Sequence, residues 1–145
     1  MANRFRSSIW FLAVASAFCA FVGAQSYQPK QRYTIAFKSF APNNTDILVA
    51  DPDGKHERPL LPDGALDYNA AFSADGQWIV FTSHRSGFAD IYRVHQDGTG
   101  FERLTNDPAF DDQGVLSPDG KSLAFVSSRS GQADIWILDL ATRRL

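Results

Sequence analysis

The same residues recur in this chain at a constant spacing of 44 positions, and this period constrains the fold more than any other feature. Three sets of residues follow it: Phe37, Phe81 and Phe125; Ser39, Ser83 and Ser127; and the pairs Asp46-Ile47, Asp90-Ile91 and Asp134-Ile135. Many coincidences at one offset are typical of a chain built from repeated structural units in equivalent environments. The sequence therefore predicts a repeat architecture with three copies.

The second and third copies share a longer motif, in which a Ser-x-Asp-Gly turn, an Arg-x-Gly turn and an aspartate follow one another. We take these residues as the repeat motif: Ser73, Asp75, Gly76, Arg85, Gly87 and Asp90 in the second copy, and Ser117, Asp119, Gly120, Arg129, Gly131 and Asp134 in the third. The first copy is degenerate, because Ala41 stands where the other copies have arginine. The Asp-Ile pair is thus common to all copies, and the Arg-x-Gly turn is an addition.

Each copy contains short runs that are typical of β-strands. "WIVFTS" and "SLAFVS" are rich in β-branched and aromatic residues, "DIYRV" and "DIWIL" follow after a turn, and "NAAFS" and "QGVLS" precede the Asp-Gly pairs. The shorter "ERLT" and "RRL" are interpreted as edge strands. The Asp-Gly pairs suit the positive φ angles of tight turns. The sequence predicts four antiparallel strands per copy and no helix.

Four strands in about 44 residues correspond to one blade of a β-propeller. A β-sandwich is the alternative, but its successive hairpins need no sequence identity. The predicted fold is therefore all-β, a partial β-propeller of about three four-stranded blades. Closed propellers have about 4 to 8 blades, whereas this chain without its first 24 residues holds fewer than three periods. We expect a fragment, a truncated gene product, or a unit that closes its ring by oligomerisation.

The first residues are typical of an export signal. Arg4 and Arg6 precede an apolar run from Ile9 to Val22, and small residues end it at Ala24. The expected organisation is a signal peptide over residues 1–24, a linker over 25–32 and propeller blades over 33–145. A retained membrane anchor is the alternative, although the uncharged stretch is marginal for the ~20 apolar residues of a spanning helix. With cleavage, no membrane span remains, and the protein is expected to be periplasmic or secreted.

Composition argues against several classes of function. Cleavage removes two of the 14 basic residues and none of the 16 acidic ones, so the mature net charge is −4, which does not favour nucleic acid as a partner. The sole cysteine leaves with the leader. The three histidines do not recur at the 44-residue offset and are interpreted as surface loop residues, and no Gly-x-Ser-x-Gly elbow is present. We expect no catalytic residues, no metal site and no cofactor.

The repeated arginines have two interpretations. Arg85 and Arg129 each precede an aspartate, Asp90 or Asp134, by five residues across a turn. A charge-assisted hydrogen bond between guanidinium and carboxylate, or bonds to turn carbonyls, would fix the hairpin. Contact with a ligand or partner is the alternative, because loops on scaffold folds are frequent binding surfaces. The structural role is the favoured hypothesis.

The order Ser-Pro-Asp-Gly, Phe-x-Ser, Arg-x-Gly, Asp-Ile-Tyr/Trp, Asp-Gly and Arg-Leu-Thr resembles the propeller repeat of the TolB family. It runs from Ser73 to Thr105, with Ala74 in place of proline, and again from Ser117 to Leu145. The resemblance implies a non-enzymatic periplasmic scaffold with protein partners in the Tol-Pal system of the cell envelope. Similar repeats form the propellers of prolyl-oligopeptidase-like and tricorn-like peptidases. The alternative is thus the amino-terminal propeller of a serine peptidase or other hydrolase.

Overall fold

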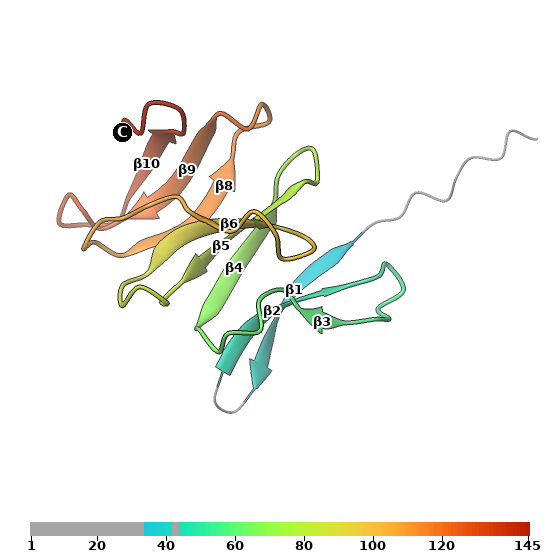
Figure 1. The fold of residues 1–145 in the computed structure, drawn as a ribbon. Coiled ribbons are helices and arrows are strands. Elements are labelled where there is room, and N and C mark those ends of the chain that lie inside the picture. Colours follow the sequence, from blue (N-terminus) through green and yellow to red (C-terminus); the bar gives the residue numbers. More distant parts are fainter. Residues whose placement is uncertain (1–33, 42–43) are drawn as a thin grey trace, which may run out of the picture. The chain divides into compact units, whose positions relative to one another are not determined.

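Strands form where β-branched and aromatic residues cluster, and Gly-containing turns separate most of them. In the computed structural model, which describes residues 34–41 and 44–145, ten strands follow one another without an intervening helix (Figure 1). Their bounds are β1 Ile35–Ala41, β2 Asn44–Ala50, β3 Arg58–Pro59, β4 Asp67–Phe72, β5 Trp78–Ser83, β6 Asp90–His95, β7 Glu102–Arg103, β8 Asp111–Leu116, β9 Ser122–Ser127 and β10 Asp134–Asp139. The predicted signal peptide and linker lie outside the described residues.

The ten strands form three antiparallel sheets, in which chain neighbours are also sheet neighbours (Figure 1). The first sheet has the order β1-β2-β3, the second β4-β5-β6-β7, and the third β8-β9-β10. Registers repeat with the sequence period, since Phe81 pairs with Tyr92 in the second sheet and Phe125 pairs with Trp136 in the third. The structure confirms the predicted all-β fold of successive blade-like sheets.

Two details of the strand prediction are corrected. Within the described part of the chain, only the second sheet has the predicted four strands, β4 to β7. The first sheet has three strands, which correspond to β5, β6 and β7. The third also has three, which correspond to β4, β5 and β6. The predicted edge strand at "RRL" is wrong: after β10 the chain turns tightly, and the N–H of Arg143 donates to the carbonyl of Asp139 at 2.9 Å. The similar run "ERLT" lies 41 residues before "RRL", and not 44, so "RRL" is out of register with the repeat.

The sheets pack face to face in chain order, and each sheet has two distinct faces. We call the face of the second sheet that carries Phe81 and Tyr92 its front, and the face that carries Val80 and Ile91 its back. The front packs on Ile47 and Val49 of the first sheet, and the back packs on Leu123, Phe125 and their neighbours in the third. Aromatic side chains at the repeated strand positions lie between the sheets, since Phe81, Tyr92 and Phe125 are buried and Trp136 is partly buried.

The first strands of the second and third sheets, β4 and β8, carry matching irregularities, and we call them the inner strands. Their pairing with β5 and β9 shifts register after Tyr68 and after Asp112. Asn69 and Gln113, 44 residues apart, hold positive φ angles of 52° and 56° at these bulges. A bulge adds one residue to a strand and increases its local twist. Both blades therefore bend their inner strand at the same place.

Within residues 34–41 and 44–145, no helix has the length and apolar character needed to cross a lipid bilayer.

Candidate functional site

The Ser-x-Asp-Gly turns close the hairpins β4-β5 and β8-β9 in the same way. Ser73 Oγ accepts the N–H of Trp78 at 2.9 Å and donates to Asp75 Oδ1 at 2.5 Å, and the N–H of Gly76 bonds to the carbonyl of Ser73 at 2.9 Å. Gly76 has a φ of 69°, which favours glycine. The third sheet repeats these contacts around Ser117.

Hydrogen bonds within the turns lower the pKa values of the turn aspartates. The hydroxyl of Ser73 and the N–H of Gln77 lower the pKa of Asp75, and the hydroxyl of Ser117 and the N–H of Lys121 lower the pKa of Asp119. Donors that point at a carboxylate stabilise its charged form. These carboxylates therefore accept hydrogen bonds within the turns.

Arg85 connects three segments of the second blade. Its Nε donates to Ser83 Oγ at 2.8 Å, and its Nη2 donates to Asp67 Oδ2 at 2.7 Å, at the start of β4. Its Nη1 donates to Asp63 Oδ2 at 2.6 Å, in the linker from the first sheet. The guanidinium also lies 4.6 Å from the ring centroid of Phe101. Arg85 thus fastens the incoming linker to its own blade.

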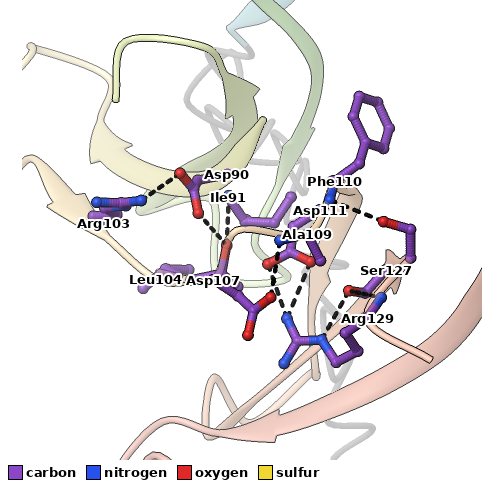
Figure 2. Close-up of polar contacts among 12 residues, drawn as sticks. Asp90, Ile91, Arg103, Leu104, Asp107, Ala109, Phe110, Asp111, Ser127 and Arg129 are labelled. Carbon is purple, nitrogen blue, oxygen red and sulfur yellow. Dashed lines mark hydrogen bonds and ion pairs between the residues drawn. The ribbon is translucent and has the colours of Figure 1, made fainter. Parts of the chain in front are cut away.

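Arg129 repeats this arrangement in the third blade, as Figure 2 shows. Its Nε donates to Ser127 Oγ at 2.8 Å, and its Nη2 donates to Asp111 Oδ1 and Oδ2 at 3.0 and 2.9 Å. Its guanidinium lies over the rings of Phe125 and Trp136, at 5.0 and 5.3 Å from their centroids. We call the two sets, Arg85-Ser83-Asp67 and Arg129-Ser127-Asp111, the linker clamps.

The carboxylates of the linker clamps are more buried than their arginines. The Asp67 and Asp111 side chains are 4% and 0% exposed, against 18% and 13% for Arg85 and Arg129. Burial raises the pKa of Asp67, although hydrogen bonds from Ser83 and Arg85 act in the opposite direction. The guanidinium therefore offsets a desolvation penalty that would otherwise favour the neutral acid.

The predicted partner of the arginines is corrected by this geometry. Arg85 does not bond to Asp90: the hydroxyl of Ser86 donates to Asp90 Oδ2 at 2.5 Å, and Arg103 Nη2 donates to the same oxygen at 2.6 Å (Figure 2 shows the Arg103 bond). In the third sheet the hydroxyl of Ser130 takes the equivalent place on Asp134. The turn serine thus bonds to the aspartate four residues later, whereas the arginine bonds to the aspartate that begins β4 or β8.

Sequence reasoning missed several members of this network. Asp67 and Asp111 were not singled out, nor were Asp63 and Asp107 in the linkers, although each pair is separated by 44 residues. The period itself was therefore the signal that could have found them. The contacts of the two linker aspartates differ: Asp63 accepts a bond from Arg85, whereas Asp107 Oδ1 accepts the N–H of Ala109 at 2.9 Å.

A hollow of about 560 Å³ lies in front of Arg129, between the second and third sheets; its lining includes Arg103, Phe125, Arg129, Leu138 and Arg143. All three guanidinium groups have acidic partners, at 2.6 Å for Arg103–Asp90, 2.9 Å for Arg129–Asp111 and 2.8 Å for Arg143–Glu102. Their charges are therefore largely neutralised within the fold. The hollow is a junction between blades rather than a cluster of free cations.

A second group of side chains lies where the linkers enter β4 and β8. The Tyr68 hydroxyl and His84 Nε2 are 3.0 Å apart, the rings of His84 and Phe110 are 6.4 Å apart, and the N–H of His84 donates to the carbonyl of Leu66 at 3.2 Å. Leu66 and Phe110 are 42% and 47% exposed. We call Leu66, Tyr68, His84 and Phe110 the linker-end patch.

The histidines differ in part from their prediction as surface loop residues. His56 is exposed and bonds to Asp51, as expected. His84, however, is partly buried in the linker-end patch. His95 is the last residue of β6, and its ring stacks on that of Trp78 with 3.8 Å between the centroids.

The described residues contain no group of three or more His, Cys, Asp or Glu side chains placed to hold a metal ion.

Comparison with known proteins assigns this sequence to a family. The sequence model of the family described as "TolB beta propeller domain" matches residues 12–145. A curated relative, the Tol-Pal system protein TolB of Desulfosudis oleivorans, is 32% identical over 53 residues, which cover 37% of this chain and 12% of that protein. The chain thus spans a small part of this relative.

Solved structures show the same architecture. The putative TolB from Agrobacterium tumefaciens is 27% identical with a TM-score of 0.68, over 77% of this chain and 43% of that one. A puromycin hydrolase is 20% identical with a TM-score of 0.64, over 81% of this chain and 20% of that one, and this similarity concerns the fold alone. The repeat motif, the blade-like sheets and the match over most of its length show that the chain belongs to the TolB β-propeller family.

Proposed function

We propose that this protein is an exported, non-enzymatic β-propeller scaffold that binds protein partners in the cell envelope, as a TolB-like component of a Tol-Pal system. The family membership and the name of the curated relative support the cellular context. The linker-end patch supports the binding role, and it is the observation that carries the proposal.

The linker-end patch has the composition of a protein-binding surface. Leu66 and Phe110 expose apolar surface, and Tyr68 and His84 add aromatic groups with polar atoms. Aromatic side chains supply much of the binding energy at protein interfaces, and loops held by a rigid scaffold are frequent binding sites. Lys38 Nζ lies 5.5 Å from the Tyr68 ring centroid, so a cation adjoins the patch.

The charged groups of the linker clamps contribute to structure rather than to a reaction. Asp67 and Asp111 are almost completely buried, and each bonds to an arginine of its own blade. A general acid or base must be within hydrogen-bond reach of a substrate. These carboxylates are instead occupied within the blade, which favours a scaffold over an enzyme.

The binding role is tested with purified peptidoglycan-associated lipoprotein from the same organism, titrated calorimetrically into the purified chain. We expect a saturable complex, and Phe110→Asp should weaken it roughly tenfold or more, because loss of an aromatic hot-spot residue costs about 2 kcal/mol or more and about 1.4 kcal/mol is tenfold in affinity. Lys121→Ala, an exposed change in the Ser-x-Asp-Gly turn, is the matched control and should bind like the wild type. Absence of binding by the wild type would contradict the proposed partner.

The exported state is proposed from the leader and is tested separately. Arg4, Arg6 and the apolar run from Ile9 to Val22 support recognition as a signal peptide. Amino-terminal sequencing of the protein from the periplasmic fraction should begin at Gln25. An intact Met1 in a soluble fraction would contradict cleavage and export.

The second candidate function is the propeller of a serine peptidase or other hydrolase. The fold is similar to part of a puromycin hydrolase, and one fold can serve several functions, so the fold alone does not separate the two classes. The genomic sequence downstream of the Leu145 codon separates them. A domain with a Gly-x-Ser-x-Gly elbow encoded in frame would overturn the scaffold proposal and support the hydrolase.

A further inference from the structure

The chain contains five Asp-Gly pairs, and aspartate rearranges to isoaspartate most readily when glycine follows it. In this reaction the amide nitrogen of the glycine attacks the side-chain carboxyl carbon of the aspartate, and glycine permits the approach because it has no Cβ. A pair reacts in a folded protein only if this nitrogen is free to move toward the carboxyl group. The pairs are Asp53-Gly54, Asp63-Gly64, Asp75-Gly76, Asp97-Gly98 and Asp119-Gly120.

The local contacts of the five carboxylates are alike. In every pair an aspartate oxygen accepts the N–H of the residue after the glycine, at 2.9 to 3.1 Å. The five donors are Lys55, Ala65, Gln77, Thr99 and Lys121. This shared contact therefore does not make one pair more reactive than another.

The glycine nitrogens, in contrast, differ. Four of them donate to the carbonyl of the residue three positions earlier, each at 2.9 Å: Gly54, Gly76, Gly98 and Gly120. Such a hydrogen bond must break before the nitrogen can reach the carboxyl carbon. Among the residues that the structure describes, the N–H of Gly64 has no such acceptor, and no atom lies within 4 Å of the place where its Cβ would be. Gly64 thus has the nitrogen that is free to attack.

The carboxyl groups of three other pairs are further protected by their charge. The neutral acid is the reactive form, because hydroxide leaves the carboxyl carbon more readily than oxide does. Hydrogen bonds within the turns lower the pKa of Asp75, Asp97 and Asp119, so these groups stay ionised to lower pH. Their turns therefore withhold both reactants, the free nitrogen and the neutral acid.

We propose that Asp63-Gly64 is a site of spontaneous modification, at which Asp63 converts to isoaspartate in the folded protein before the other four pairs react. The Gly64 nitrogen bonds to Cγ of Asp63, and the carboxyl hydroxyl and the amide proton leave as water. Solvent water then adds to the main-chain carbonyl carbon of Asp63 and breaks its bond to the nitrogen. The chain now runs through Cγ, and no atoms are gained or lost overall.

Conversion removes the contact that fastens the linker to the second blade. Isoaspartate adds Cβ to the main chain and shortens the side chain by one carbon, so the bond of 2.6 Å between Asp63 Oδ2 and Arg85 Nη1 is lost. Arg85 keeps its bonds to Ser83 and Asp67, so the linker clamp remains. The linker is thereby released three residues before Leu66. This inference is independent of the proposed scaffold function.

The site is tested by incubation of the folded protein in mildly acidic buffer. Isoaspartate is located by peptide mapping with mass spectrometry, and is verified by an isoaspartyl methyltransferase that transfers a labelled methyl group from S-adenosylmethionine to the new carboxylate. Conversion at Asp63 should be several times faster than at any other pair. In urea the turns are lost, and the preference for Asp63 should disappear.

Two results of this experiment would overturn the proposal. One is faster conversion at another pair in the folded protein, or none at Asp63 while the chain in urea reacts. The other is an equal preference for Asp63 in urea, because the preference would then arise from the neighbouring sequence and not from the fold.

Matched variants test the chemistry and its consequence. Asp63→Glu keeps a carboxylate but needs a less favourable six-membered ring, so modification at this position should be lost. Asp53→Glu, the same change at a side chain that is 58% exposed, is the control and should convert at Asp63 like the wild type. Circular dichroism verifies that both variants are folded. Methylation of Asp63→Glu at the wild-type level would contradict the assignment.

Release of the linker is measured on the modified protein after its separation from the unmodified form by ion exchange. Amide hydrogens of residues 61–66 should exchange faster in the modified form, whereas those of β5 should be unchanged, because the linker clamp remains. Equal exchange of residues 61–66 in the two forms would show that the contact between Asp63 and Arg85 does not hold the linker.

Discussion

At the scale of single residues, the blades are held by polar contacts whose partners are far apart in sequence. Arg129 bonds to Asp111 and Ser127, and stacks on two aromatic rings, so one side chain joins the inner strand, the central strand and the turn. When one partner of a buried charged pair is removed, the other is left buried without its counterion, which is strongly destabilising. The two clamps therefore make the fold sensitive to single substitutions.

Removal of the clamp arginine should destabilise the third blade strongly. Arg129→Ala leaves Asp111, which is 0% exposed, buried without its counterion, and the free energy of unfolding should fall by roughly 3 to 5 kcal/mol. Urea unfolding followed by circular dichroism measures the change. Arg129→Lys keeps the charge but lacks the second nitrogen that bonds to Ser127, and its loss of stability should be smaller than that of Arg129→Ala. Unchanged unfolding of Arg129→Ala together with lost partner binding would instead assign this residue to binding.

The turn aspartates predict how stability depends on pH. Hydrogen bonds lower the pKa of Asp75, Asp97, Asp119 and Asp139 in the folded protein. Because the folded pKa lies below the unfolded value of about 3.9, the stabilisation is complete above that pH and is lost as pH falls through the folded values. Tm should therefore fall as the pH drops below about 4. Asp67, whose pKa is raised by burial, acts in the opposite direction.

Asp119→Asn tests this linkage. An asparagine oxygen still accepts hydrogen bonds in the turn but does not titrate, so the acid-side slope of Tm against pH should be shallower than that of the wild type. Tm is measured by circular dichroism between neutral pH and the acid transition. An unchanged slope would show that the turn carboxylates do not govern acid unfolding.

Residue roles could be inferred from the sequence only where the partner is local. The Ser-x-Asp-Gly turn was predictable because its hydrogen bonds join residues two to five positions apart. The partner of Arg85 was mistaken because the nearest acid in sequence, Asp90, is reached by the shorter Ser86, while Asp67 becomes a neighbour only after β4 pairs with β5. Tertiary pairing, rather than proximity in sequence, decides such contacts.

At the scale of strands and sheets, the spacing between blades depends on small residues in the inner strands. A Cβ at Gly114 in β8 would lie 2.6 Å from Ile91 Cγ2 and 3.2 Å from Val80 Cγ1 of the preceding sheet. Ala70 holds the equivalent position in β4 and packs against the core that contains Ile47. The back-face isoleucine of one sheet thus meets a small residue of the next.

Gly114→Ala should therefore destabilise the protein by overpacking, by about 1 to 3 kcal/mol. Its φ angle is not in the left-handed region, so the cost arises from contact and not from backbone strain. Combination with Ile91→Ala should cost less than the sum of the two changes, because the shorter side chain makes room for the new methyl group. Additive losses in urea unfolding would indicate that the two sheets do not meet at this point.

Strand boundaries followed from the period more reliably than from local composition. "WIVFTS" and "SLAFVS" match the bounds of β5 and β9, and both runs lie in register with the repeat. "RRL" has a similar composition to "ERLT" but is displaced by three positions, and the hydrogen bonds around Asp139 form a turn there. Similar local composition therefore does not predict a strand where a side chain such as that of Asp139 stabilises a turn.

At the scale of the whole described unit, each sheet is stabilised mainly by its neighbours. β5 and β9 are both central strands with partners on either side, but β5 lies between two sheets whereas the back of β9 faces outward. Amide hydrogens in β9 should therefore exchange faster than those in β5 at low protein concentration, because local opening exposes less buried surface. The fold class was predictable at this scale, since the period reflects equivalent packing environments.

Hydrogen exchange measured by mass spectrometry tests this comparison. Equal protection of β5 and β9 would contradict the dependence on neighbouring sheets.

The repeated fit of an isoleucine-bearing back to a phenylalanine-bearing front also bears on how such chains change in length during evolution. A duplication of one 44-residue stretch of coding sequence inserts a sheet whose two faces already match both of its new neighbours. A deletion of the same length joins two faces that match as well. The number of blades can therefore change by one in a single genetic event, without the prior evolution of a new interface.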